Sequence, residues 1–438
     1  MDGFQETKPA LAPDEALAEA NRCLMCYDAP CTRACPTHID VPSFIKKIAT
    51  GNLRGSARTI LTANVLGASC ARVCPTEVLC EGACVLNDLH HKAIKIGQLQ
   101  RHATDWLMEK GGRIFDPPVE RAFSRVAVVG AGPAGLSCAA ELVRRGHHPV
   151  VFDAAPQAGG LNTYGVADYK MTPAFALREV AWVRELGVEI RSGVTVGKDV
   201  SLADLERDYA AIFIGVGLGR VAALRIPGEE LQGVVDALDF IAELKTDRAA
   251  ASAKVAGRRV VVVGGGNTAI DATTQSSRLG AAEVTLVYRR GRDEMPAYHH
   301  EQELARHDGA RFLFEAAPQH IDGVGRVEGI TLRKMKSVGE GRAARLEPIL
   351  GSDFRVACEL VIRANGQTAQ EALLASLPGV KLANNRPVVG ENMQTSNPRY
   401  FAGGDCISGG QEVVNAVAEG KRAGATIDAW VRCQIKVA

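Results

Sequence analysis

The stretch Val126-Ala-Val-Val-Gly-Ala-Gly-Pro-Ala-Gly135 decides how the central part of this chain folds. Four apolar residues predict a buried strand, and a helical pattern from Leu136 to Arg145 follows the glycines directly, which is the context that a G-x-G-x-x-G turn requires. The first glycine allows a tight turn, the second lets the backbone approach a pyrophosphate, and the third lets the helix pack closely. The expected loop consists of Gly130, Gly132, Pro133, Ala134 and Gly135.

A second strand, from Pro149 to Phe152, ends in Asp153, eighteen residues beyond Gly135. Its carboxylate can accept hydrogen bonds from the ribose of a bound nucleotide. A glycine turn by itself also arises by chance in loops, but the full order of strand, turn, helix, strand and acid predicts a dinucleotide site. We expect FAD there.

The same pattern returns at Val260-Val-Val-Val-Gly-Gly-Gly-Asn-Thr-Ala269, with Ala269 in place of the third glycine. The next strand ends in Arg289 and Arg290 rather than in an acid, and guanidinium groups favour the 2′-phosphate of NADP. Two arginines after a strand are equally typical of a solvated loop, so the choice between NAD and NADP stays open. The residues expected to bind NAD(P) in this turn are Gly264, Gly266, Asn267 and Thr268.

The charges of the whole chain almost cancel, with 51 Lys and Arg against 50 Asp and Glu. A net charge of +1 produces no field that would gather nucleic acid or an anionic membrane surface. No uncharged apolar run reaches roughly 18 residues, and the start carries acidic residues without an apolar signal segment. We therefore expect a cytoplasmic protein without nucleic-acid or membrane partners.

Twelve cysteines are present, eight of them between Cys23 and Cys84. Because the cytoplasm keeps thiols reduced, these eight predict metal ligands rather than disulfides. The first group, C-x2-C-x4-C-x3-C-P from Cys23 to Pro36, follows bacterial ferredoxin spacing, and the second runs from Cys70 to Cys84. Eight thiolates suffice for two 4Fe-4S clusters, whereas structural zinc, the alternative, prefers paired C-x2-C motifs.

These patterns predict an α/β chain, in which an N-terminal α-helical iron-sulfur domain precedes two Rossmann-like domains. The tail after Pro398 begins strand-like and becomes helical, so we expect it to return to the first nucleotide domain, with the second inserted. The predicted domains are 1–122 for two 4Fe-4S clusters, 123–235 and 366–438 for FAD, and 236–365 for NAD(P).

With the cysteine array, the two fingerprints and Gly403-Gly404-Asp405, the sequence resembles one family from end to end. That family contains the small subunit of bacterial glutamate synthase, the N-terminal part of dihydropyrimidine dehydrogenase, and the free-standing NAD-dependent dihydropyrimidine dehydrogenase subunit of bacteria. The segments Ile96-Gly-Gln-Leu-Gln100 and Gly409-Gly-Gln-Glu-Val-Val-Asn-Ala416 are similar to characteristic segments of the last group. The resemblance implies an electron-input flavoprotein subunit.

The resemblance also implies that the two cysteine groups interleave. Counting thiols alone would choose Cys70 as the eighth ligand, but Gln100 lies in the family's Ile-Gly-x-Leu-Gln context, and Cys70 then becomes a buried spectator. The implied ligands are Cys23, Cys26, Cys31 and Cys84 for one cluster, and Cys35, Cys74, Cys80 and Gln100 for the other.

For the flavin, the resemblance implies the pyrophosphate at Gly130 to Gly135, the ribose at Asp153, the isoalloxazine near Lys170 and the ribityl chain at Asp405. Relatives usually carry Glu where Asp153 stands, and for Lys170 a solvated loop lysine is the alternative. The amides of a helix that starts near Glu412, Val413 and Val414 could stabilise the negative charge of reduced flavin. Gly160, Gly404, Asn365 and Gly366 complete the expected cofactor contacts.

The sequence thus predicts hydride transfer from NAD(P)H to FAD and release of single electrons through the clusters. Because no array of eight strand-helix repeats is present to hold FMN and a pyrimidine, we expect the substrate site on an FMN- and iron-sulfur-containing partner subunit, which reduces uracil or thymine to the 5,6-dihydropyrimidine. The alternatives are a glutamate synthase small subunit, a ferredoxin-NADP reductase-type subunit, and a non-catalytic nucleotide-binding assembly factor with zinc.

Overall fold

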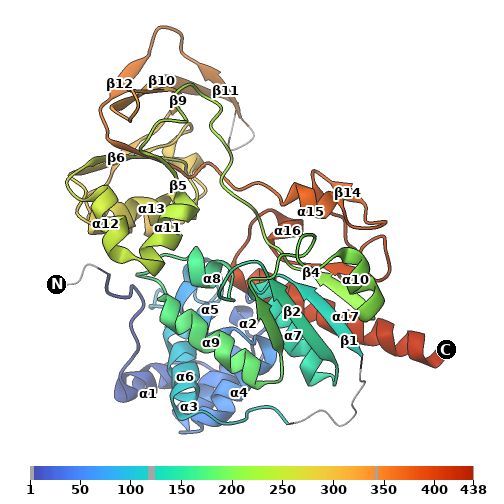
Figure 1. Ribbon diagram of the computed structural model, residues 1–438. Helices are drawn as coiled ribbons and strands as arrows, with labels where there is room; N and C mark the ends of the chain where they lie inside the picture. The colour runs from blue at the N-terminus through green and yellow to red at the C-terminus, as the bar shows by residue number, and fades with distance from the viewer. Residues whose placement is uncertain (1–3, 117–123, 340, 342–343, 438) are drawn as a thin grey trace. The chain divides into compact units, whose positions relative to one another are not determined.

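The computed structural model describes residues 4–116, 124–339, 341 and 344–437, which divide into two compact units (Figure 1). The large unit comprises Glu6–Thr163, Pro173–Leu218 and Ala369–Ala438, and the inserted unit comprises Met1–Gln5, Tyr164–Thr172 and Gly219–Thr368. The predicted domain boundary at 122/123 lies outside the described residues. The boundaries at 235/236 and 365/366 stay predictions.

The N-terminal part of the large unit is helical, as the spacing of its apolar residues predicts. Asp40 caps α3 by accepting a hydrogen bond from the Ser43 amide (3.1 Å), and Asn52 caps α4 through the Gly55 amide (2.8 Å). The helices bury an apolar core around the fully covered Phe44. They are α1 (Pro13–Asn21), α2 (Pro30–Arg33), α3 (Val41–Ala49), α4 (Leu53–Ala63), α5 (Gly67–Val73), η1 (Thr76–Val78) and α6 (Ile96–Lys110).

The rest of the large unit is built on a parallel sheet with the strand order β16-β4-β1-β2-β3. Strand β16 comes from the tail and pairs with β4, so the tail returns to the first sheet as expected. The strands are β1 (Arg125–Val129), β2 (His148–Asp153), β3 (Glu189–Ser192), β4 (Ala211–Ile214) and β16 (Tyr400–Ala402). The remaining elements are α7 (Pro133–Arg144), α8 (Leu161–Tyr164), α9 (Pro173–Glu185), α10 (Leu202–Asp208), α15 (Glu371–Ala375), β14 (Leu382–Ala383), β15 (Arg386–Pro387), α16 (Asp405–Ser408) and α17 (Val413–Val437).

The inserted unit contains a second parallel sheet, with the order β5-β13-β6-β7-β8. It also contains an antiparallel sheet of strands β9 to β12, which lie between β8 and β13 in the sequence. The predicted α/β class with two Rossmann-like sheets is therefore confirmed. The parallel strands are β5 (Val234–Asp236), β6 (Arg259–Val263), β7 (Glu283–Val287), β8 (Arg311–Leu313) and β13 (Leu360–Arg363). The other elements are α11 (Ala237–Thr246), α12 (Arg248–Val255), α13 (Asn267–Arg278), η2 (Arg292–Glu294), α14 (His299–His307), β9 (Ala316–Asp322), β10 (Gly329–Val338), β11 (Arg345–Pro348) and β12 (Phe354–Val356).

The C-terminal helix α17 packs along α7 at two glycines (Figure 1). A Cβ atom on Gly420 would lie 2.0 Å from the carbonyl oxygen of Ala134, and one on Gly424 would lie 2.9 Å from that of Cys138. This close approach fixes the first turn of α7, which carries part of the predicted pyrophosphate loop. Neither α17 nor any other described helix combines the length and the apolar run needed to cross a membrane, and the cytoplasmic location stays a prediction.

Replacing Gly420 by Val should therefore destabilise the protein and weaken flavin retention. Overpacking at a tight contact costs about 1–3 kcal/mol, and here the displaced group is the backbone of Ala134. Urea unfolding followed by circular dichroism and the flavin content of the purified protein measure the two effects. Ala429→Val on the exposed side of α17 is the control, because it adds a β-branched residue to the same helix without the contact. Equal stability of the two variants would contradict the packing argument.

Candidate functional site

The first glycine turn has the backbone geometry that the fingerprint predicts. Gly130 adopts a φ of 103°, and a Cβ there would lie 2.4 Å from the carbonyl oxygen of Gly215 at the end of β4. A Cβ on Gly135 would lie 1.9 Å from the carbonyl oxygen of Gly130. The turn therefore accepts only glycine at both positions, and α7 starts at Pro133 with its N-terminus toward the loop.

The second glycine of the turn faces another glycine across the loop. Gly132 has open space on its side-chain face, where the nearest atom is the Cα of Gly160, 3.9 Å from an ideal Cβ. Gly160 has a φ of 55°, and a Cβ on it would come within 2.8 Å of the Cα of Gly132. Two facing backbones without side chains fit a pyrophosphate, whose oxygens bind backbone amides at a helix N-terminus.

Asp153, the predicted ribose ligand, lies at the end of β2 beside this turn. Its carboxylate accepts hydrogen bonds from the backbone amides of Ala131 (2.5 Å) and Ala155 (2.8 Å), one on each oxygen. Burial raises the pKa of Asp153, and the two amides oppose that shift. Each oxygen keeps a second lone pair, so the side chain can support the loop and still accept a ribose hydroxyl.

Asp405 follows a left-handed glycine at the start of α16. Gly404 has a φ of 80° and donates its amide to Glu419 of α17 (2.6 Å), and Asp405 accepts a hydrogen bond from the Gln411 amide (3.0 Å). Burial raises the pKa of Asp405 and also that of Glu419, on which the Asp405 charge acts in the same direction. Two carboxyl groups thus meet at this turn, where sequence reasoning expected one.

The N-terminus of α17, predicted to lie near the flavin, packs against the cysteine-bearing helices. Val414 is 2% exposed and belongs to the same apolar core as Cys35, Cys70 and Cys84, with Val413 packed against that core. Glu412, partly buried, precedes the first turn of the helix. The predicted flavin end of α17 and the cysteine array therefore share one core within the large unit.

The second glycine turn, in the inserted unit, repeats the construction of the first. A Cβ on Gly264 would lie 2.2 Å from the carbonyl oxygen of Ala364, while Gly266 has open space on its side-chain face. Asn267 starts α13 and accepts a hydrogen bond from the Tyr298 amide (3.2 Å), and Thr268 follows it in the first turn. The turn fits a nucleotide pyrophosphate at Gly266.

The two arginines after β7 differ in their surroundings. Arg289 is exposed, whereas Arg290 donates to the carboxylate of Glu294 (3.1 Å) and to the carbonyl oxygen of Ala344 (2.9 Å). A guanidinium that is already paired is less available for a phosphate. Arg289 is therefore the better candidate for contact with a 2′-phosphate.

Lys170 lies in an ionic cluster of the inserted unit. Its ammonium contacts the carboxylates of Asp271 on α13 (2.8 Å) and Glu301 on α14 (2.7 Å), and Tyr169 donates its hydroxyl to Asp271 (2.9 Å). Burial alone would lower the pKa of Lys170, but the two carboxylates outweigh it, and the pKa is raised. The alternative of a solvated loop lysine is wrong, and contact with the isoalloxazine stays a prediction.

The crossover after β13 has the open backbone that a cofactor contact needs. Asn365 and Gly366 are exposed, Gly366 has a φ of 100°, and its carbonyl oxygen accepts the Ala222 amide (2.7 Å). A left-handed glycine lets the chain turn there without strain. The contact of Asn365 and Gly366 with a nucleotide stays a prediction.

The first implied set of cluster ligands borders a single pocket. Burial raises the pKa of Cys31 to about 11, with the thiols of Cys23 and Cys84 acting in the same direction, so these groups are neighbours. The walls of the pocket are apolar, which suits a buried 4Fe-4S cluster held by thiolates. Its lining includes Cys23, Cys26, Cys31 and Cys84, with Val41, Ile45, Leu86, Ile94 and Ile96.

The thiols of the second implied set also lie close together, and Cys70 lies among them. A hydrogen bond with Cys70, burial, and the thiols of Cys80 and Cys35 raise the pKa of Cys74. The sulfur of Cys70 accepts a hydrogen bond from the buried amide of Asn64 (3.2 Å). Cys70 therefore lies beside Cys74, within the second group of thiols.

Gln100 is buried on α6, where its amide nitrogen donates to the Gly67 carbonyl oxygen (2.6 Å). Because the nitrogen is engaged as a donor, the carbonyl oxygen of Gln100 is the atom that can reach a metal. Within the described residues, no three His, Cys, Asp or Glu side chains converge on a point that could hold a single metal ion. Thiols spread around a pocket instead suit a cluster of several irons.

Sequence reasoning missed two carboxylates that hold the site together, Glu179 and Glu419. Glu179 is 1% exposed and occupies the buried face of α9 with Phe175, Ala176 and Val180. An acid at helical spacing within an apolar stripe signals a buried carboxylate with partners, and that signal was available.

Two protein families match the two parts of this arrangement. Residues 1–112 match a family described as dihydropyrimidine dehydrogenase domain II, 4Fe-4S cluster, and residues 124–420 match the pyridine nucleotide-disulphide oxidoreductases. The chain belongs to the pyridine nucleotide-disulphide oxidoreductase family. Its cofactors are FAD, NAD(P)H and 4Fe-4S clusters, as expected, and the cluster match favours iron over the zinc alternative.

Several relatives match the chain over nearly its whole length. The small chain of NADPH glutamate synthase from Halomonas elongata is 38% identical and covers 96% of this chain and 92% of its own. The NAD-dependent dihydropyrimidine dehydrogenase subunit PreT of Escherichia coli O157:H7 is 33% identical, and the match covers 97% of this chain and 96% of PreT. The structure of Mycobacterium tuberculosis FprA with NADPH has a TM-score of 0.60 at 20% identity over 72% of this chain and 86% of that one, which shows the fold.

Cys70→Ser should leave the iron content at about eight per chain, while Cys74→Ser should lose about half of it, because thiolate ligation decides cluster retention. Iron analysis and electron paramagnetic resonance (EPR) of the reduced proteins test this, with Cys358→Ser in the inserted unit as the control. Loss of a cluster in Cys70→Ser would assign the eighth ligand to Cys70 instead of Gln100.

Arg289→Ala should lower kcat/KM for NADPH by roughly tenfold or more and leave that for NADH nearly unchanged, because a charge-assisted hydrogen bond contributes about 1.5–3 kcal/mol. Arg290→Ala should have the smaller effect, since Glu294 already pairs with it. Steady-state kinetics with ferricyanide and both nucleotides measure the ratio. An equal fall with both nucleotides would show that neither arginine reads a 2′-phosphate.

Proposed function

We propose that this chain is an electron-input subunit, which takes hydride from NAD(P)H onto FAD and passes single electrons through two 4Fe-4S clusters to a partner. The observation that carries the proposal is the shared core of the large unit. Val414, at the predicted flavin end of α17, packs with Cys35, Cys70 and Cys84. We infer that packed protein joins the predicted flavin site at the start of α17 to the cysteine array.

The residues of the chain have distinct tasks in this scheme. FAD supplies hydride acceptance and one-electron release, and the clusters supply one-electron carriage. The turns at Gly130 and Gly264 bind and orient the two nucleotides through backbone amides. The partly buried pair Asp405 and Glu419 fixes the turn at Gly404, and the N-terminal dipole of α17 would stabilise negative charge near Glu412.

Two cysteines outside the array, Cys138 and Cys406, are buried in packed surroundings. Cys138 is fully buried in α7 where α17 crosses it, and Cys406 is fully buried with its thiol directed to the carbonyl oxygens of Ile214 (3.5 Å) and Gly403 (3.3 Å). Burial raises the pKa of the Cys406 thiol to about 12, which opposes thiolate chemistry. These surroundings favour an exit through the clusters over one through a cysteine pair.

For the partner, we favour an FMN- and iron-sulfur-containing subunit that reduces uracil or thymine to the 5,6-dihydropyrimidine. The segments Ile96 to Gln100 and Gly409 to Ala416 resemble those of the dihydropyrimidine dehydrogenase subunits, and PreT is a relative over the whole chain. A glutamine-dependent glutamate synthase partner is the second candidate. The higher identity of the Halomonas elongata small chain supports it.

The isolated protein should oxidise NAD(P)H rapidly with ferricyanide and leave uracil and thymine unchanged, since its fingerprints account for donor and flavin only. Mixed with an FMN- and iron-sulfur-containing partner subunit, it should drive nicotinamide-dependent reduction of uracil, and chromatography of the products measures that reaction. Cys74→Ser should abolish the coupled reaction and spare part of the dye activity. Uracil reduction by this chain alone would contradict the scheme, and coupling only to a glutamine-dependent partner would select the second candidate.

A further inference from the structure

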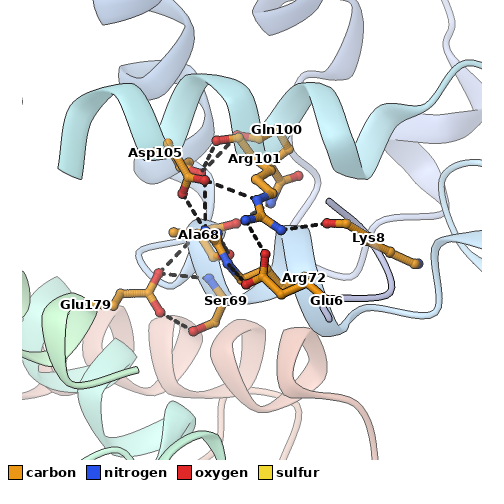
Figure 2. Close-up of polar contacts among 11 residues, drawn as sticks. Glu6, Lys8, Ala68, Ser69, Arg72, Gln100, Arg101, Asp105 and Glu179 are labelled. Atoms are coloured by element: carbon orange, nitrogen blue, oxygen red, sulfur yellow. Dashed lines mark hydrogen bonds and ion pairs between the residues drawn. The ribbon is translucent and has the colours of Figure 1, made fainter. Parts of the chain in front are cut away.

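A buried carboxylate joins the flavin side of the large unit to the helix that carries cluster residues. Glu179 of α9 accepts hydrogen bonds from the backbone amides of Ala68 (3.0 Å) and Ser69 (3.1 Å) and from the Ser69 hydroxyl (Figure 2). All three donors belong to the first turn of α5 (Gly67–Val73). A single side chain thus accepts hydrogen bonds from two buried amides of that turn, which have no partner within the helix.

Burying a carboxylate destabilises a fold unless hydrogen bonds or charges compensate for the lost solvation. Burial raises the pKa of Glu179 to about 7, and the hydrogen bonds from Ser69 and Ala68 and the charge of Arg72 oppose the shift. An apolar residue would fill the same face of α9 without that cost. The three directed bonds supply what an apolar residue lacks, which is a fixed position for α5.

Helix α5 is the element that presents the second cluster site. Cys70 lies in its middle and Cys74 at its C-terminal end, and the carbonyl oxygen of Gly67, in the turn that Glu179 holds, accepts the amide of Gln100. A shift of this seven-residue helix would move the candidate ligands together.

The last turn of α5 is held by Arg72. Its guanidinium makes two hydrogen bonds to Asp105 of α6 (both 2.8 Å) and lies 3.4 Å from the centre of the Phe175 ring on α9. Arg101 donates to the same Asp105 (3.1 Å), and Glu6 pairs with Arg101 (Figure 2). Helix α5 is therefore clamped between α6 and α9.

The other end of this connection reaches the flavin loop. Val180, the residue after Glu179, packs against Gly159, because a Cβ on that glycine would be 3.5 Å from the Val180 side chain. Gly159 in turn donates its amide to Ala131 (2.8 Å), inside the pyrophosphate turn. Adjacent residues of α9 thus contact the flavin loop and the cluster helix.

We propose that Glu179 is a positioning residue for electron transfer, which fixes α5 and its cluster ligands relative to the flavin loop. The proposal rests on the electron-input function given above. In this role the hydrogen bonds that Glu179 accepts matter more than its negative charge. A glutamine at this position can still accept the two backbone amides through its carbonyl oxygen.

Glu179→Ala should change the EPR signal of one reduced cluster and slow cluster reduction by about tenfold, because small misplacements of reacting groups have large kinetic effects. Flavin reduction by NAD(P)H should keep its wild-type rate. Anaerobic stopped-flow spectroscopy at pH 8, above the pKa of Glu179, follows both steps. Glu179→Gln should stay near wild type, and Glu185→Ala, exposed on the same helix, is the control.

An unchanged EPR signal and an unchanged cluster reduction rate in Glu179→Ala would overturn the proposal. If that variant fails to fold, Ser69→Ala removes one of the three hydrogen bonds and should shift the same EPR signal, and no shift would again overturn it. A wild-type protein without cluster signals would instead overturn the proposed function. The two failures are therefore distinguishable.

Discussion

Direct contact between backbones at the carboxyl ends of the parallel strands is the constraint on which both nucleotide turns depend. Gly130 lies against Gly215, and Gly264 lies against Ala364, so closely that any Cβ would overlap a carbonyl oxygen. The strand that crosses next to each turn therefore forms the floor of the loop. A larger residue would push the loop into the space that a pyrophosphate needs, so we expect Gly130 and Gly264 to be required for nucleotide binding.

Close packing also brings the N-terminus of α17 and the cysteine array into one core. Helix α17 approaches α7 at Gly420, and its first turn places Val414 among the apolar residues around the cysteines. Glu179 adds a directed polar contact to this apolar packing. Apolar contacts are tolerant of sliding, whereas a carboxylate with three donors specifies one position, which is the property that electron transfer between fixed centres needs.

The local sequence pattern gave the least information about which charged side chains form ion pairs inside the fold. Lys170 and Arg290 were both compatible with solvated loops, yet Asp271 and Glu301 enclose the first and Glu294 pairs with the second. The carboxylates that pair with Lys170 lie more than one hundred residues away in the chain. No periodicity links such partners, because ion pairs of this kind form only after separate helices pack.

The sequence by itself determined the two nucleotide folds, the return of the tail to the first sheet, and the metal-binding nature of the cysteine array. Each of these depends on local sterics or spacing: a glycine turn between strand and helix, or thiols at intervals that wrap a cluster. Tertiary structure alone decided that Asp153 braces its own loop, that Arg289 rather than Arg290 is exposed, and that Glu179 holds α5. Those outcomes depend on distances between residues that are remote in the chain, and such distances are set only when the helices and sheets pack together.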